Sequence, residues 1–146
     1  MSRIAFTGYT LCGVASIILG LVYLMRTEFM PYHAEAVRTD WASLPSGTRA
    51  LIGALMNVLG AAWVSVGIAV LALVAIAYRS GNMIARWLVP VVLIALYGSI
   101  LIVILQVQVT TGAATPWMTN AFAVALAVLC LIIDAPWTRH KRNTAA

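Results

Sequence analysis

The chain has 146 residues, of which 63% are hydrophobic and 9% are charged, and its formal net charge is +5. A soluble domain is about half apolar and about a quarter charged, so a water-soluble fold of this length could not bury this much apolar side chain. The composition therefore excludes an ordinary soluble protein. It predicts an integral membrane protein with one domain over residues 1–146.

Four apolar runs are long enough to cross a bilayer as helices, which takes about 20 residues each. They cover residues 4–25, 50–78, 87–109 and 117–137. The alternating pattern of a β-barrel is missing, and unbroken runs of this length require helices that satisfy their own backbone hydrogen bonds. We therefore predict an all-α fold of four transmembrane helices. The short second and third connections favour an antiparallel bundle.

The first run follows Met-Ser-Arg and is longer than the apolar core of a signal peptide. No small-residue cleavage site follows it, so we expect a retained membrane helix. Cys12 in this run and Cys130 in the fourth run both have apolar neighbours. We expect these cysteines to be packing residues rather than a disulfide or a metal pair.

Residues 26–49 form the one long polar segment between apolar runs, and they hold three of the four acidic residues and one of the two histidines. Apolar residues recur within this loop every three or four positions. That spacing predicts a short amphipathic helix, on the membrane surface or over the mouth of the bundle. The apolar residues are Met30, Ala34, Val37, Trp41 and Leu44.

Four polar side chains of this loop are candidates for a ligand or metal site: His33, Glu35, Arg38 and Asp40. A histidine with carboxylates can bind a divalent metal or transfer a proton, but zinc catalysis normally needs three protein ligands. The loop has one histidine and no paired-histidine spacing. We therefore expect no metal and no cofactor, and an enzyme or metal site at this loop is the third alternative for the function.

The second run carries the clearest packing signal, because Gly53, Gly60 and Gly67 recur every seven residues and Asn57 falls between the first two. Small residues on one seam of a membrane helix let another backbone approach closely. We expect Asn57 on this contact face, and the pattern leaves open whether the seam packs within one chain or between subunits. A neighbouring strip at spacing four follows, formed by Ala61, Ser65 and Ala69.

Three further polar or aromatic residues lie within the spans: Trp63 and Tyr97 near the middle, and Gln106 near the end of the third run. Their structural interpretation is interhelical hydrogen bonding. Their functional interpretation is a pathway for a small solute or ion, lined together with Asn57. Asp134 lies at the end of the fourth run, and we expect it to pair with an arginine, either Arg3, Arg86 or Arg139.

Orientation follows from the distribution of Lys and Arg. Six of the nine lie on the side shared by the N-terminus, the second connection and the C-terminus, and three lie on the opposite side. We therefore predict a multi-pass protein of the cell membrane, with both termini cytoplasmic and residues 26–49 extracytoplasmic. The basic residues stand at the ends of apolar runs, which predicts contact with anionic headgroups of the lipid bilayer and not with nucleic acid.

No nucleotide-binding, metal-binding or nucleophile motif is present, so the sequence favours a protein that is not an enzyme. The first hypothesis is function by association, as a homo-oligomer or as an accessory subunit of a membrane-protein partner, through the glycine seam and the loop. The alternative is a small-solute or ion pathway between the helices, with the loop as a lid.

Overall fold

The computed structural model describes residues 1–141, with side chains described as far as Thr138. Four of its helices are long and apolar enough to cross a membrane, which indicates a multi-pass membrane protein and confirms the all-helical prediction. The long helices are α1 (Arg3–Met25), α3 (Ser46–Ser80), α4 (Met83–Thr111) and α5 (Trp117–Asp134). The short ones are α2 (Pro31–Val37) and the 3-10 helices η1 (Trp41–Ser43) and η2 (Pro136–Lys141).

Capping residues, rather than the ends of the apolar runs, set the helix boundaries. The side chain of Ser2 accepts a hydrogen bond from the Ala5 N–H at 3.2 Å to start α1, and Asn82 accepts one from the Ala85 N–H at 3.0 Å to start α4. Gly81 ends α3 in the left-handed conformation, with φ of 66°. Both α3 and α4 begin four residues before their apolar runs, α4 at the Asn82 cap and α3 after Pro45 without a side-chain cap.

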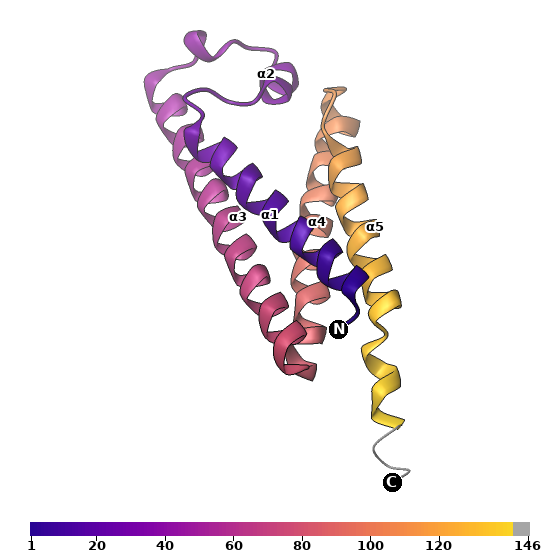
Figure 1. Ribbon diagram of the computed structural model, residues 1–146. Helices are drawn as coiled ribbons and strands as arrows, with labels where there is room; N and C mark the ends of the chain where they lie inside the picture. Colours follow the sequence, from indigo (N-terminus) through magenta and orange to yellow (C-terminus); the bar gives the residue numbers. More distant parts are fainter. Residues whose placement is uncertain (142–146) are drawn as a thin grey trace.

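The helices pack as two pairs (Figure 1). Helix α1 lies along α3, and α4 lies along α5, while α1 also contacts α5 near the N-terminus. The N-terminus and the turn between α3 and α4 lie at one end of the molecule, here called the N-terminal end. Helix α2 and the connection between α4 and α5 lie at the other end, here called the loop end. Toward the loop end the two pairs diverge, and α2 lies between them.

Glycines allow α1 and α3 of the same chain to pack closely. Gly60 and Gly67 of α3 are both buried against α1, where a Cβ on Gly67 would lie 2.8 Å from the Gly13 carbonyl oxygen. Gly53, one heptad earlier, has nothing within 4 Å of a built Cβ. Two of the three glycines of the predicted seam thus pack against α1 of the same chain, because their missing side chains let the backbones approach.

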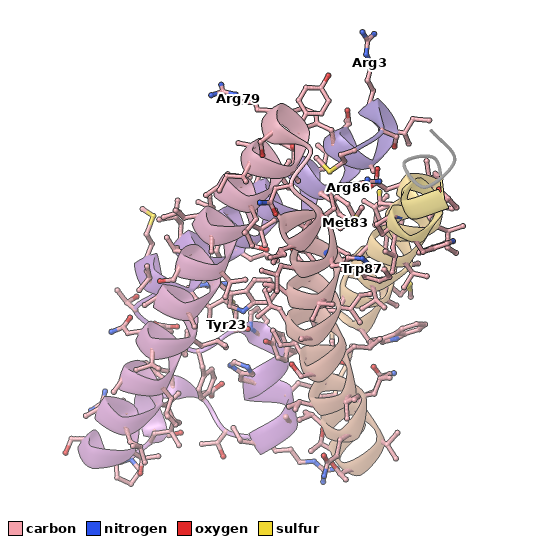
Figure 2. The ribbon with its side chains drawn as sticks, turned by 90° about the horizontal axis from the view of Figure 1, so that it is seen from below. Arg3, Tyr23, Arg79, Met83, Arg86 and Trp87 are labelled. Carbon is pink, nitrogen blue, oxygen red and sulfur yellow. The ribbon has the colours of Figure 1, made fainter. Side chains whose placement is uncertain are left out.

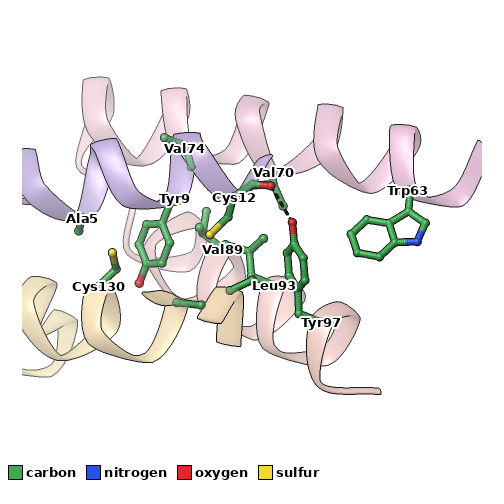
Figure 3. Packing of buried hydrophobic residues seen from close by; sticks show 12 residues of the cluster. Ala5, Tyr9, Cys12, Trp63, Val70, Val74, Val89, Leu93, Tyr97 and Cys130 are labelled. Carbon is green, nitrogen blue, oxygen red and sulfur yellow. Dashed lines mark hydrogen bonds between the residues drawn. The ribbon is translucent and has the colours of Figure 1, made fainter. Parts of the chain in front are cut away.

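A buried cluster joins the four long helices at mid-length (Figure 3). The hydroxyl of Tyr97 donates a hydrogen bond to the Cys12 carbonyl oxygen at 3.1 Å and lies 3.0 Å from the Ser16 hydroxyl. Tyr97 therefore links α4 to α1 by a polar contact within the cluster. The apolar members around it include Val70, Val74, Val89, Leu93 and Ala127.

An ion pair closes the N-terminal end. Arg86 of α4 is 2% exposed, and its Nε donates to the Asp134 carboxylate at 2.8 Å. A guanidinium Nη donates to the Asp134 carbonyl oxygen at 2.9 Å, so the arginine also caps α5. The Ser2 N–H donates to the second carboxylate oxygen at 2.7 Å. Arg3 and Arg79 instead point away from the helices (Figure 2).

Candidate functional site

A cavity of about 570 Å³ lies at the loop end, where the two helix pairs diverge beneath α2. All four long helices contribute to its wall, together with residues 29–41 around α2, here called the α2 segment. This volume falls within the range of small-molecule sites, about 300–1,000 Å³. The lining residues are Leu19, Val22, Tyr23, Met30, Tyr32, His33, Leu59, Trp63, Ser99, Ile100, Val103, Ile104, Val107, Pro116, Thr119 and Asn120.

Two hydrogen bonds hold α2 over this cavity, one to each helix pair. The Tyr32 hydroxyl lies 2.6 Å from the hydroxyl of Tyr23 on α1. On the other side, the Glu35 carboxylate accepts a hydrogen bond at 2.9 Å from the Ala114 N–H, in the connection between α4 and α5. Helix α2 has only seven residues, so these contacts and its packing, rather than its own helical stability, fix its position.

The loop around α2 has its own local order. Pro31 stands at the first helical position, and Arg38 ends the helix in the left-handed conformation with φ of 52°. The rings of Phe29 and Trp41 meet edge to face with centroids 5.1 Å apart, and Phe29 is buried. This contact ties the two ends of the α2 segment together over the helices.

The lining is apolar apart from a few neutral polar groups. Burial lowers the pKa of His33, so this side chain is neutral at pH 7. Its Nδ1 accepts the Met30 N–H at 3.3 Å, which assigns the proton to Nε2. Burial and the hydrogen bond to Tyr23 raise the pKa of Tyr32, which stays protonated. The wall therefore carries no formal charge, which favours a neutral apolar occupant over an ion.

Asn120, in the first turn of α5, is the most unusual group in the wall. The residue is 8% exposed, and its Oδ1 atom has no hydrogen-bond partner in the described chain. Its Nδ2 donates only a long hydrogen bond, 3.5 Å, to the Pro116 carbonyl oxygen. A buried acceptor without a partner costs about 1–3 kcal/mol. Such a group marks the place where an unaccounted partner would bind.

Some of the residues predicted for the pathway line the cavity, and others do not. Trp63 and His33 line the cavity. Tyr97 is buried beside Trp63, with ring centroids 5.1 Å apart, but its hydroxyl faces α1 and is outside the lining. Asn57 and Gln106 are exposed and do not border the cavity.

The polar loop residues do not converge on a metal site. Glu35 holds the α2 segment in place, while Arg38 and Asp40 are exposed. Among the described residues, no group of three His, Cys, Asp or Glu side chains is placed to hold a metal ion.

Sequence reasoning missed Tyr23, Tyr32, Thr119 and Asn120 as parts of a site. Tyr23 lies near the end of an apolar run, where an amphipathic ring is expected to lie in the headgroup zone. A signal for Asn120 does exist, because it shares one face of α5 with Ala123 and Ala127 at spacings of three and four. Small residues on that face indicate contact with another helix, so an amide in the same register is expected to point inward.

No protein-family model, curated protein or solved structure matches the chain, so its functional assignment depends on the geometry of the cavity.

Proposed function

We propose that the protein binds a small, largely apolar molecule in the loop-end cavity, within a membrane, and that the α2 segment acts as its lid. The observation that carries this proposal is a cavity of about 570 Å³, whose wall is built from all four long helices and carries no formal charge. Apolar walls with a few placed polar groups are typical of ligand sites. An ion would lose its hydration there without compensation, so the proposal replaces the ion pathway with a neutral ligand.

The membrane setting of the proposal follows the distribution of charge. We propose an antiparallel four-helix bundle in the cell membrane, with α2 as a short amphipathic helix on the extracytoplasmic side and both termini in the cytoplasm. The basic residues at the N-terminal end, Arg3, Arg79 and Arg86, support this sidedness. The cavity then lies in the outer half of the bilayer and can receive a ligand from the outer leaflet or from the outer surface.

Fluorescence quenching tests the binding. A variant that keeps Trp63 as its only tryptophan, purified in detergent, is titrated with 1-bromododecane, since bromine quenches indole fluorescence on contact. We expect saturable quenching, because Trp63 is 4% exposed but borders the cavity. A variant that keeps only Trp87, which is 40% exposed outside the cavity, reports non-specific quenching in the micelle. Equal, non-saturating quenching of both variants would reject the proposal.

A second proposal is self-association, and it is supported by the outer face of α3. Because Gly60 and Gly67 are covered by α1, association is proposed through the neighbouring strip of exposed small residues. The strip runs along one side of the helix: Ala50, Ala54, Asn57, Ala61, Ser65, Ala69 and Ala72. A carboxamide offers both a donor and an acceptor, so Asn57 in two copies related by a two-fold axis can satisfy itself.

The mass of the protein–detergent complex tests this second proposal. We expect a dimer for the unmodified chain and a monomer for Ala61→Leu, which fills the strip without touching the interior. Ala95→Leu, the same change at an exposed alanine of α4, is the matched control and should stay dimeric. A monomeric mass for the unmodified chain would exclude self-association.

A further inference from the structure

We propose that the ligand is an uncharged amphiphile whose head carries a hydroxyl group, and that Asn120 Oδ1 accepts the hydrogen bond from that hydroxyl. This inference rests on the proposed function, since it names the chemistry of the molecule in the same cavity. It is carried by a separate observation, the unpartnered buried acceptor of Asn120 in the cavity wall.

The distribution of groups along the cavity gives the orientation of the ligand. The polar lining residues Tyr23, Tyr32 and His33 lie beside the α2 segment, and Thr119 and Asn120 lie in the first turn of α5, at the same end. The opposite part of the wall is formed by Trp63 of α3 and by Ser99 and Ile100 of α4. The Ser99 hydroxyl donates to carbonyl oxygens of its own helix, so this part of the wall offers no free donor. A ligand with a polar head under α2 and an apolar chain toward mid-membrane matches this gradient.

The absence of cations in the wall defines the charge of the head. None of the described lining residues is Lys or Arg, and His33 is neutral. A phosphate or carboxylate head would be desolvated there without a charged partner, which is strongly unfavourable. Arg26 and Arg38 of the loop are exposed and do not border the cavity, so they cannot pair with an anionic head inside it. The cavity therefore selects a neutral head.

The unpartnered acceptor decides between donor and acceptor heads. The carboxamide of Asn120 has its Nδ2 directed at the Pro116 carbonyl oxygen, so the Oδ1 atom is the free site. Because Oδ1 is itself buried, the carboxamide must turn about its terminal torsion, which is broad in asparagine, to present Oδ1 to a hydroxyl in the cavity. An ether or ester head, which only accepts, leaves Oδ1 without a partner.

Two probes that differ only in the head test the inference. The variant with Trp63 as its only tryptophan is titrated with 12-bromododecan-1-ol and with its methyl ether. The alcohol should bind about threefold to tenfold more tightly, the range of one neutral hydrogen bond. In Asn120→Leu both probes should bind with equal affinity, whereas Asn57→Leu, an exposed position outside the cavity, should keep the preference.

The outcomes separate this inference from the proposed function. If neither probe quenches Trp63 saturably, the cavity is no ligand site and both proposals are overturned. If both bind with equal affinity to the unmodified chain, the hydroxyl assignment is overturned and the ligand site stands. If the preference survives in Asn120→Leu, Asn120 is not the acceptor. The comparison of the two probes on the chain with Asn120 in place remains decisive even where Asn120→Leu does not fold.

Discussion

Gly20 of α1 and Gly60 of α3 face each other backbone to backbone. A Cβ on Gly20 would lie 2.6 Å from the Gly60 carbonyl oxygen, and a Cβ on Gly60 would lie 2.8 Å from the Gly20 carbonyl oxygen. Contacts this short are not tolerated between a real Cβ and a backbone atom, so only glycine fits at both positions. The crossing sets the distance between α1 and α3, and with it one wall of the cavity, to which Leu19 and Trp63 belong.

Substitution of Gly60 by alanine should therefore destabilise the protein. We expect a loss of about 1–3 kcal/mol from overpacking, because the helices must separate. Gly53→Ala is the matched control on the same helix, where a Cβ meets nothing within 4 Å. It should stabilise the helix by about 0.5–1 kcal/mol, since glycine is a poor helix former. Thermal unfolding in detergent measures the stability of both variants. Equal unfolding temperatures for Gly60→Ala and Gly53→Ala would contradict the close contact between Gly20 and Gly60.

The ion pair at the N-terminal end should be costly to break. Asp134→Ala leaves the guanidinium of Arg86 buried without its partner, and we expect a loss of about 3–5 kcal/mol. Replacement of both residues, by Arg86→Met and Asp134→Leu, should recover part of the stability, because the guanidinium and the carboxylate are removed together. The N-terminal ammonium, 3.9 Å from the Asp134 carboxylate, loses this ion partner in both variants. Arg79→Ala removes an exposed arginine at the same end and serves as the control. If chemical unfolding gives the same free energy of unfolding for Asp134→Ala and Arg79→Ala, the ion pair does not contribute to stability as predicted.

The closure of the lid should depend on pH through His33. Its pKa in the folded protein is lowered by burial, so the unfolded or open loop binds the proton more readily than the closed one. The closed state is therefore fully favoured above the ordinary histidine pKa of about 6.5 and weakens as the pH falls below it. Protonated Nδ1 also loses its ability to accept the Met30 N–H.

Release of bound bromododecane from the Trp63 variant measures this effect. We expect faster release at pH 5 than at pH 7.5 for the chain with His33, and no acceleration for His33→Asn, which keeps a side-chain acceptor but does not titrate. All other titratable groups are identical in the two proteins, so the comparison isolates the contribution of His33. The same acceleration in His33→Asn would assign the pH dependence to another group.

The attachment of the lid should be testable by cross-linking. Glu35→Cys combined with Ala114→Cys places two thiols across the contact that ties α2 to the α4–α5 connection. A short bis-methanethiosulfonate linker should slow the binding and release of bromododecane, and reductant should restore them. Cys12 and Cys130 are buried and should not react. Unchanged rates in the linked protein would show that the ligand enters between the helices instead of past α2.

The sequence was sufficient for the fold class and the four spans, because hydropathy over about 20 residues directly measures the ability to cross a bilayer. It was not sufficient to tell which polar residue turns inward. Asn57 and Asn120 both stand in apolar runs, yet Asn120 is buried and Asn57 is exposed. The buried face of α3 includes Met56, Gly60 and Trp63, and Asn57 lies one residue off this face.

The cavity could not be predicted from the sequence either. Its wall combines residues from α1 to α5, and their convergence depends on the angle between the two helix pairs, which local patterns do not encode. The lid contacts show the same limit. Apolar spacing predicts a helix in the loop, but it does not identify the hydrogen-bond partners of Tyr32 and Glu35. These partners, Tyr23 and Ala114, lie 9 and 79 residues away.

Native mass spectrometry of the protein purified in mild detergent from its own membranes tests the central proposal most directly. We predict a bound molecule of a few hundred daltons, without phosphate, on the unmodified chain. It should be missing from Ile100→Phe, which fills the cavity, and retained by Ile102→Phe, an exposed position two residues away that does not border it. The bare mass of the chain for all three proteins, or the same adduct on all three, would contradict a ligand site beneath the α2 segment.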